Sequence, residues 1–237
     1  MPKFAVILAA AGNSTRFGNA RRKKPFIELK GRPVWVRAIE PFLAHPDVVQ
    51  SLVVVSPSEI DWFKEQFRAN LAFMNLEVVP GGKERTDSVR NGLERVLPDV
   101  DFVAVHDAAR PLITRQWIDA VFEAASASGA AIPAVPISST IKRVQGKTIL
   151  ETVPRDQLWS AQTPQVIARQ TLLEAYAQRS GPIATDEAQL VEQLGKTVTI
   201  VETSPVNLKI TTQTDFRMAE ALLSILPKEK NDAWQFL

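Results

Sequence analysis

Several apolar stretches of this sequence run into loops of small residues and cations, a combination that suits the binding of phosphate groups. The first apolar run, 4–8, leads into the small-residue turn 9–12, and Arg16 and Lys24 lie in the loop that follows. Small residues allow backbone N–H groups to approach an anion, and fixed cations neutralise its charge. We therefore predict a phosphate site where the first strand ends.

A second loop, 81–88, has the residues to hold a flat ligand close to the backbone. Gly81 and Gly82 leave room for such an approach, Lys83 adds a cation and Ser88 adds a hydroxyl. A glycine pair on its own is more typical of a simple turn. Its position after an apolar run favours a binding loop.

A third loop, 106–111, places a carboxylate and a guanidinium around two alanines. Asp107 is a candidate ligand for Mg²⁺, which takes one or two carboxylates and shares its other positions with phosphates and water. Arg110 follows three residues later, and His106 is more typical of a packed hydrogen-bonding residue than of a base. Cations around one metal-binding carboxylate indicate phosphoryl or nucleotidyl transfer, where catalysis is mainly positioning and charge neutralisation.

Apolar runs alternate with amphipathic stretches over most of the chain, and these elements must position the three loops. Strands that are apolar throughout predict an α/β fold with a parallel sheet covered on both faces, and ligands bind at the carboxyl ends of such strands. We expect a helix after Ser56 that begins with a capping box to Glu59. The expected strands are 4–8, 51–55, 76–79, 102–105, 130–135, 197–201 and 208–210, and the other expected helices begin near 33, 87, 114, 169, 185 and 212.

The segment 137–155 interrupts this rhythm. Two β-prone runs flank a turn at Gly146, which predicts a hairpin. The hairpin has little apolar surface to bury by itself, so we expect it to project as an arm. Such an arm needs a partner, and the simplest partner is a second copy of the chain.

The whole-chain composition excludes several classes of protein. The chain has 237 residues and no cysteine, which excludes disulfides, thiol catalysis and Cys-ligated zinc. A formal charge of +2 is too small for a nucleic-acid coat, and no apolar run approaches the ~20 residues of a membrane span. No secretory signal pattern is visible at the N-terminus. We expect a single domain over 1–237 that is cytoplasmic and binds neither nucleic acid nor membrane.

Blocks of sequence that recur in one family narrow the chemistry further. They are A-A-A-G-x-S-T-R-F-G followed by K-P-F, then P-G-G-K-E-R-x-D-S-V, V-H-D-A-A-R-P, T-I-K-R, W-x-A-Q-T-P-Q, T-D-E-A and N-L-K-I-T. In order and spacing, from Ala9 to Thr211, they resemble the 2-C-methyl-D-erythritol 4-phosphate cytidylyltransferases. The resemblance implies a Rossmann-like three-layer nucleotidyltransferase fold with a mostly parallel sheet and a projecting β-hairpin arm, used for homodimerisation through 137–155.

The resemblance also implies roles for individual residues. Catalysis is assigned to Arg16, Lys24 and Lys209. Binding of CTP is assigned to Ala10, Ala11, Gly12, Gly82, Lys83, Ser88 and Asp107, and Asp107 also holds Mg²⁺ or another divalent cation. Binding of the polyol phosphate is assigned to Arg110, Thr140, Arg155 and Thr163, with Thr140 and Arg155 reaching from the arm into the site of a partner subunit.

In the implied reaction, a phosphate oxygen of the acceptor attacks the α-phosphorus of CTP in line and expels pyrophosphate. The nucleophile is already ionised, so neither a covalent intermediate nor a strong base is required. Arg16 and Lys24 would stabilise the pentacoordinate phosphorus. Lys23 competes with Lys24 for this role, and we assign it to Lys24 because that residue directly precedes Pro25.

One position departs from the family pattern. The family commonly has an aspartate before Asn-Leu-Lys, as a second carboxylate beside the metal, and this chain has Val206 there. Either Asp107 acts with phosphates and water alone, or another acid substitutes.

Three other functions remain as alternatives. A ribitol 5-phosphate cytidylyltransferase would keep the chemistry and change the acceptor. A dinucleotide-dependent oxidoreductase is disfavoured, because its G-x-G-x-x-G fingerprint is missing after the first strand. A catalytically inactive binding homologue is disfavoured by Arg16, Lys24, Asp107 and Lys209, whereas Val206 is compatible with it.

Overall fold

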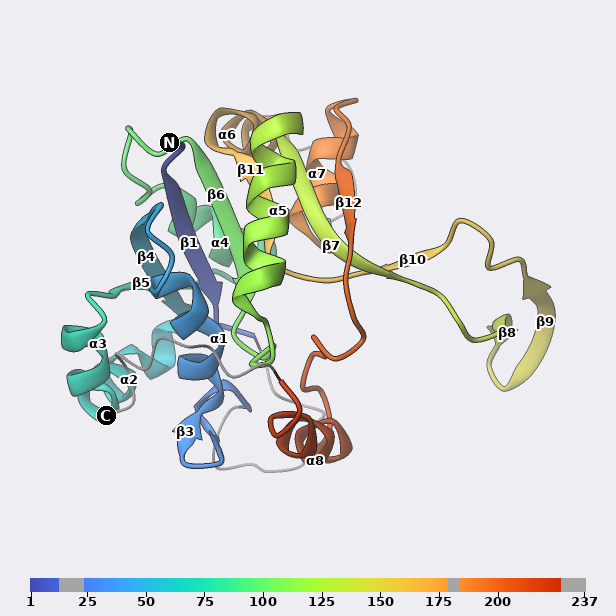
Figure 1. Ribbon diagram of the computed structural model, residues 1–237, viewed down its shortest axis with the longest axis horizontal. Coiled ribbons are helices and arrows are strands. Elements are labelled where there is room, and N and C mark those ends of the chain that lie inside the picture. The colour runs from blue at the N-terminus through green and yellow to red at the C-terminus, as the bar shows by residue number, and fades with distance from the viewer. Residues whose placement is uncertain (13–23, 179–183, 227–237) are drawn as a thin grey trace.

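The computed structural model describes residues 1–12, 24–178 and 184–226, apart from the side chain of Lys24. Figure 1 shows a central sheet between helices, with a long hairpin that extends away from the body. In the described residues, no helix has the length and apolar character needed to cross a membrane.

The central sheet is mostly parallel, as the apolar runs predict. Its order is β10-β7-β11-β6-β1-β4-β5, and β12 also pairs with β7. The register places Ile7 of β1 beside Leu52 on one neighbour and Val105 on the other. The strands are β1 (Phe4–Ala9), β4 (Val48–Val55), β5 (Glu77–Pro80), β6 (Phe102–Asp107), β7 (Ala130–Pro136), β10 (Trp159–Ala161), β11 (Gln165–Ala168) and β12 (Thr199–Glu202).

Alternating side chains of β1 enter two separate cores, which makes the fold three-layered. Phe4, Val6 and Leu8 pack with α1 (Val34–Leu43), α2 (Ile60–Gln66) and α5 (Arg115–Ser128). Ala5 and Ile7 pack on the other face with α4 (Arg85–Leu93), α6 (Arg169–Ala177) and α7 (Glu187–Gln193). Because successive residues of a strand point to opposite faces, a continuously apolar strand is what two covered faces require.

The second half of the sheet differs from the expectation in two places. β11 is an additional strand that lies antiparallel between β6 and β7. The predicted strand at 208–210 is wrong, because this segment forms no ladder; Ile210 N donates instead to Ala109 O at 2.8 Å. That bond still holds the segment beside the loop after β6.

Of the helix caps predicted from the sequence, one is confirmed and one is wrong. Thr114 caps α5 through its side chain, as expected. The predicted capping box at Ser56 is wrong: Ser56 forms no side-chain cap, and a 3₁₀ turn, Pro57–Glu59, precedes α2. A capping box occurs instead at the start of α4, where Glu84 and Asp87 bond reciprocally. The helix therefore begins two residues earlier than expected, which brings Arg85 into its first turn.

Figure 1 shows α3 (Arg68–Phe73) at the side of the body next to α2, and β3 (Arg32–Pro33) and α8 (Gln213–Leu222) at the end of the body opposite the N-terminus. A third apolar cluster at that end joins Leu29, Leu112 and Ile210 to α8, and Val206 packs against it. The other elements are the 3₁₀ turn η2 (Lys24–Phe26), the ribbon β2 (Glu28–Leu29) with β3, and the turn η3 (Pro57–Glu59).

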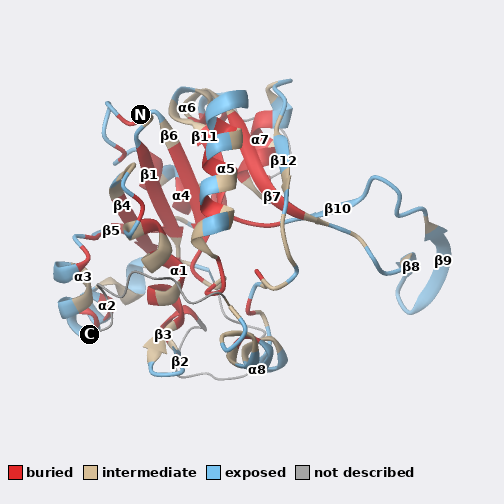
Figure 2. Ribbon diagram, viewed as in Figure 1, coloured by how far each residue is buried: buried red, intermediate tan, exposed pale blue. Residues whose placement is uncertain are grey.

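The predicted arm is present as β8 (Ile141–Gln145) and β9 (Thr148–Val153). These strands pair only with each other in the described residues, and they extend well clear of the body (Figure 1). Figure 2 shows the arm as almost entirely exposed, in contrast to the red core strands. Its apolar side chains are exposed as well, with Val144 at 54%, Ile149 at 59% and Leu150 at 56%.

Candidate active site

A cavity of about 530 Å³ opens where β1, β5 and β6 end. The three loops that the sequence singles out all line it, together with the segment around Lys209. The predicted site residues on its wall are Ala10, Ala11, Gly12, Gly82, Lys83, Ser88, Asp107 and Lys209. The carboxyl ends of parallel strands therefore meet at one site, as this class of sheet requires.

A second cavity, of about 460 Å³, lies beside the first, between the end of β7 and the base of the arm. Arg110 lines it, with Ser138, Ser139 and Gln162 among its polar neighbours. Lys209 lines both cavities. One ammonium group can therefore contact ligands on either side.

The loop after β5 is shaped by close contacts of its glycines. A Cβ on Gly81 would lie 2.6 Å from Ala11 Cβ, and a Cβ on Gly82 would lie 2.4 Å from Asp87 Cβ. Ser88 Oγ accepts from Gly82 N at 3.0 Å and donates to Glu84 O at 3.0 Å. The Ser88 hydroxyl thus closes the loop, and only glycine fits where the two strand-end loops touch.

Asp107 lies at the centre of a cluster of three cations. Its Oδ2 is 2.7 Å from Lys209 Nζ and 3.7 Å from Arg110 Nε, and its Oδ1 is 3.5 Å from Arg85 Nε. Burial alone would raise the pKa of this carboxyl, but Lys209, Arg85 and Arg110 hold it well below its ordinary value. Asp107 is therefore an anion at any physiological pH.

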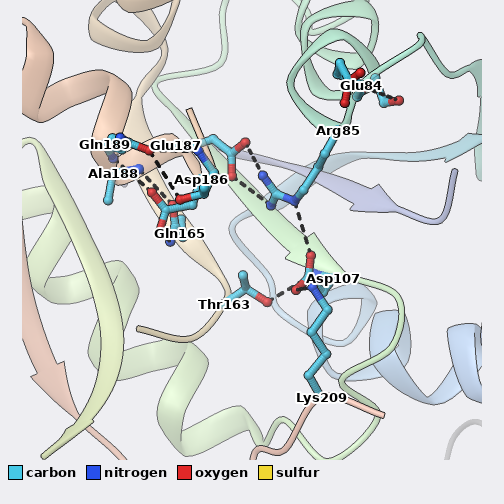
Figure 3. A network of polar contacts seen from close by, with 12 residues as sticks. Glu84, Arg85, Asp107, Thr163, Gln165, Asp186, Glu187, Ala188, Gln189 and Lys209 are labelled. Atoms are coloured by element: carbon cyan, nitrogen blue, oxygen red, sulfur yellow. Dashed lines mark hydrogen bonds and ion pairs between the residues drawn. The ribbon is translucent and has the colours of Figure 1, made fainter. Parts of the chain in front are cut away.

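Arg85 and Glu187 also belong to this cluster; both lie in the quoted family blocks, P-G-G-K-E-R-x-D-S-V and T-D-E-A, but neither was assigned a role in the site from the sequence. The guanidinium donates to both Glu187 oxygens, at 2.7 Å and 2.9 Å, while its Nε faces Asp107 (Figure 3). Burial lowers the pKa of Arg85, but Glu187 and Asp107 raise it above its ordinary value. In the sequence Glu187 looks like an ordinary helix-start acid, and its partner is 102 residues away.

His106 and Thr163 form a buried support beneath Asp107. His106 Nε2 lies 3.2 Å from Arg110 O, so it carries the proton, because a carbonyl can only accept. Nδ1 then accepts from Thr163 Oγ1 at 3.1 Å, and that hydroxyl accepts from Asp107 N at 3.1 Å. Burial lowers the pKa of His106 to about 4, so a neutral imidazole orients the loop and does not act as a base.

Asn207 holds the segment that carries Lys209. Its side-chain amide donates to Gln162 Oε1 at 2.9 Å and to Thr163 O at 3.0 Å. Its own carbonyl accepts from Arg110 Nη1 at 2.7 Å. These bonds replace the strand ladder that we expected and fix Lys209 between the two cavities.

The remaining predicted residues lie elsewhere. Arg16 is outside the described residues, and of Lys24 only the backbone is described, in the turn η2. Thr163 is buried and lines neither cavity. Thr140 and Arg155 are exposed at the base of the arm and also line neither cavity; Arg155 donates to Ser138 O.

The donor set fits a divalent cation that shares its ligands with phosphates. In the described residues no cluster of three metal-binding side chains occurs, and Glu187 is committed to Arg85. Asp107 Oδ1, however, receives only the long contact from Arg85 among the ion pairs of the described residues. One available carboxylate oxygen is sufficient where phosphates and water supply the other ligands of Mg²⁺.

Comparison with known sequences identifies relatives over nearly the whole chain. The family model of 2-C-methyl-D-erythritol 4-phosphate cytidylyltransferase (IspD) matches residues 4–225. The enzyme of that name from Bacillus licheniformis is 40% identical over 222 residues, which covers 93% of this chain and 95% of the relative. The one from Clostridioides difficile is 36% identical over 231 residues, covering 97% and 96%.

Solved structures agree with the sequence relatives. A crystal structure of 4-diphosphocytidyl-2C-methyl-D-erythritol synthase matches with a TM-score of 0.80 at 32% identity, over 94% of this chain and 99% of the other. The 2-C-methyl-D-erythritol 4-phosphate cytidylyltransferase of Thermus thermophilus matches with a TM-score of 0.76 at 32% identity, over 94% and 100%. Fold and sequence therefore point to the same relatives.

Proposed function

The chain belongs to the 2-C-methyl-D-erythritol 4-phosphate cytidylyltransferase family, and we propose that it converts CTP and 2-C-methyl-D-erythritol 4-phosphate into 4-diphosphocytidyl-2-C-methyl-D-erythritol and pyrophosphate. This reaction supplies isoprenoid precursors by the non-mevalonate route. The sequence relatives and solved structures described above carry this acceptor in their names, so a ribitol 5-phosphate enzyme is not favoured.

The observation that carries the proposal is the position of Lys209, which lines both cavities and lies 2.7 Å from Asp107 in the wall of the first. Ala10, Ala11 and Gly12 with the loop 81–88 form the nucleotide side. Arg110 forms the acceptor side, with Thr163 in support. A group shared by both ligands is what the transfer of a nucleotidyl group between two phosphates needs.

The residues of this chain position two anions and stabilise the charge that develops between them. Lys209 binds the acceptor phosphate and directs its oxygen toward the α-phosphorus of CTP. Arg16 and Lys24 neutralise the charge on that phosphorus as pyrophosphate leaves. No residue needs to remove a proton, because the attacking phosphate oxygen is already ionised, and the neutral His106 agrees with this.

Asp107 would hold the divalent cation through its Oδ1, with Mg²⁺ as the natural choice. When bound, this cation neutralises charge on the CTP phosphates. Gly82, Lys83 and Ser88 shape the pocket for the base. Val206 packs against the apolar cluster under α8 and takes no part.

Thr140 and Arg155 complete the acceptor site of a second copy of the chain. The arm extends away from its own body, and its apolar side chains are exposed, which supports a homodimer formed through 137–155. Each acceptor site would then combine the body of one subunit with the arm base of the other.

The test is pyrophosphate release from CTP with each acceptor, measured with Mg²⁺ and with EDTA. We expect turnover with 2-C-methyl-D-erythritol 4-phosphate that requires the cation. Faster turnover with ribitol 5-phosphate would contradict the proposed acceptor. Absence of turnover with both acceptors would support the alternative of an inactive binding homologue.

Variants of the first loop test the assignment of the charges. Arg16→Ala and Lys24→Ala should each lower kcat by ~10²–10³, the usual effect of removing one preorganised charge-stabilising donor. Lys23→Ala is the matched control and should keep nearly normal turnover. A larger loss for Lys23→Ala than for Lys24→Ala would transfer the role to Lys23.

A further inference from the structure

Glu187 is a fully buried carboxylate that lies outside both cavities. Its residue exposure is 0%, and it lines neither cavity. Both of its oxygens bond to the guanidinium of Arg85, which itself lines the first cavity. Glu187 can therefore influence a ligand only through another residue.

The bidentate contact fixes which part of Arg85 faces Asp107. The two terminal nitrogens point at Glu187, and only Nε approaches Asp107 Oδ1, at 3.5 Å (Figure 3). A free guanidinium grips a carboxylate through two parallel N–H bonds of about 2.7–2.9 Å. Glu187 thus occupies the two terminal N–H donors of Arg85, which could otherwise form such a paired contact with Asp107.

The start of α7 is anchored so that Glu187 cannot follow a moving Arg85. Gln165 of β11 accepts from Ala188 N at 2.8 Å and donates to Asp186 Oδ2 at 2.9 Å. Asp186 Oδ1 in turn accepts from Gln189 N at 3.0 Å. The carboxylate is therefore fixed to the sheet on one side and to Arg85 on the other, as Figure 3 shows.

We propose that Glu187 is a positioning residue for the CTP site, holding the Arg85 guanidinium back so that an oxygen of Asp107 stays available to a cation bound with CTP. The inference rests on the proposed function, because it assumes that CTP binds with a divalent cation at Asp107. Glu187 also offsets one of the three positive charges around Asp107, which favours a further cation there.

A purely structural ion pair would behave differently. Loss of a structural pair weakens CTP binding under all conditions, because the loop before α4 becomes disordered. Loss of a restraint on Arg85 weakens only the part of the binding that depends on the cation. The two roles are therefore separated by measuring CTP affinity in Mg²⁺ and in EDTA.

The experiment is calorimetric titration of CTP, without acceptor, into the full chain and its variants. Glu187→Gln should raise the Kd of CTP about tenfold in Mg²⁺, the lower end of the usual effect of removing an outer partner of a metal ligand. Its Kd in EDTA should match that of the unmodified protein. Glu174→Gln is the matched control, since Glu174 is an exposed acid that pairs with Lys196, and it should change neither value.

The double variant Arg85→Gln/Glu187→Gln tests whether Glu187 acts through Arg85. With the guanidinium removed, Asp107 Oδ1 loses its contact with Arg85, while Lys209 and Arg110 remain at Oδ2, so the effect of Mg²⁺ on CTP binding should return relative to Glu187→Gln. This variant also contains no unpaired buried charge, which keeps the test valid if Glu187→Gln folds poorly.

Two results would overturn the inference. One is an equal loss of CTP affinity with and without Mg²⁺ in Glu187→Gln, and the other is a double variant that stays as insensitive to Mg²⁺ as Glu187→Gln. If the unmodified protein binds no CTP, the proposed function fails as a whole. If it binds CTP and Glu187→Gln responds to Mg²⁺ in the same way, only the role of Glu187 fails.

Discussion

The cluster around Asp107 buries charged side chains, whereas the β8–β9 arm exposes apolar ones. In the cluster, Asp107, Arg85 and Glu187 are partly or fully buried and bind one another. In the arm, Ile149 and Leu150 are more than half exposed, and its strands pair only with each other among the described residues. The charged side chains of the cluster thus find partners within the chain, whereas the apolar side chains of the arm are not covered by any described residue.

This difference indicates that the two regions contribute to the binding of different substrates. A buried cluster whose charges pair with one another is preorganised and needs no partner to hold its geometry. Exposed apolar side chains grouped on a projecting hairpin are typical of a protein–protein contact. We therefore propose that the cluster serves the nucleotide within one chain and that the arm serves the acceptor in another.

The largest expected effect is on kcat and comes from a substitution in the cluster around Asp107. Lys209→Ala removes the ammonium that lines both cavities and contacts Asp107 Oδ2. We expect kcat to fall by ~10²–10³, because one preorganised cation is lost from the reacting phosphates. Steady-state kinetics measures this. A change in the KM for CTP alone would place Lys209 on the nucleotide and not between the two ligands.

Next in size is a variant of the arm base. Arg155→Ala should raise the KM for the acceptor about 10- to 100-fold, the effect of losing one hydrogen bond to a charged group, and leave the Kd of CTP unchanged. Arg143→Ala is the control within the arm, because Arg143 pairs with Glu151 on the neighbouring strand. Equal losses for both variants would mean that Arg155 only stabilises the arm.

A smaller effect concerns stability and pH. The pKa of His106 is about 4 in the folded state because of burial, whereas an unfolded histidine titrates near 6.5. Between these values the unfolded chain binds more protons, so the free energy of unfolding decreases as pH falls. From pH 7 to pH 5 this loss is about 2 kcal/mol.

The measurement is urea unfolding of the ligand-free protein in EDTA at both pH values. Other acids titrate in this range too, so the relevant quantity is the difference from His106→Gln, which cannot titrate. The unmodified protein should lose about 2 kcal/mol more than the variant. The same pH dependence in both proteins would show that His106 is accessible to protons.

The smallest expected effect on stability is that of Ile149→Asp in the arm. Ile149 is 59% exposed, so the free energy of unfolding of the isolated chain should change by no more than about 0.5 kcal/mol. Light scattering should nevertheless show a monomer where the unmodified protein forms the proposed dimer. A dimer that persists in the variant would show that the subunits contact each other through another surface.

Much of the fold could be predicted from patterns contained in one segment, although the capping box expected at Ser56 was wrong. The apolar run of β1, the cap at Thr114 and the hairpin of the arm are local patterns, and each appears in the structure. β11 was missed because four residues between longer strands carry no period of their own. The strand expected at 208–210 is wrong because this segment is held by single contacts to distant loops, from Ile210 N to Ala109 O and from the side chain of the preceding Asn207 to Gln162 and Thr163, and not by a ladder.

The site residues that could be predicted are those that lie at or after the end of a strand or in a family block. Asp107, Ser88 and Lys209 could be brought together from their positions after strands and from family blocks. Glu187 stands in the family block T-D-E-A, but its role could not be predicted, because its burial and its bond to Arg85 depend on how α7 packs on the sheet. An acidic residue at a helix start looks the same in sequence whether it is solvated or buried.

The division between body and arm is tested most directly by mixing two impaired variants, Asp107→Asn and Arg155→Ala. Each is impaired alone, but a mixed dimer would contain one site with an intact Asp107 in its body and an intact Arg155 from its partner's arm. Random exchange of subunits in an equal mixture should restore about a quarter of the normal activity. Activity no higher than the mean of the separate variants would show that each site uses the arm of its own chain.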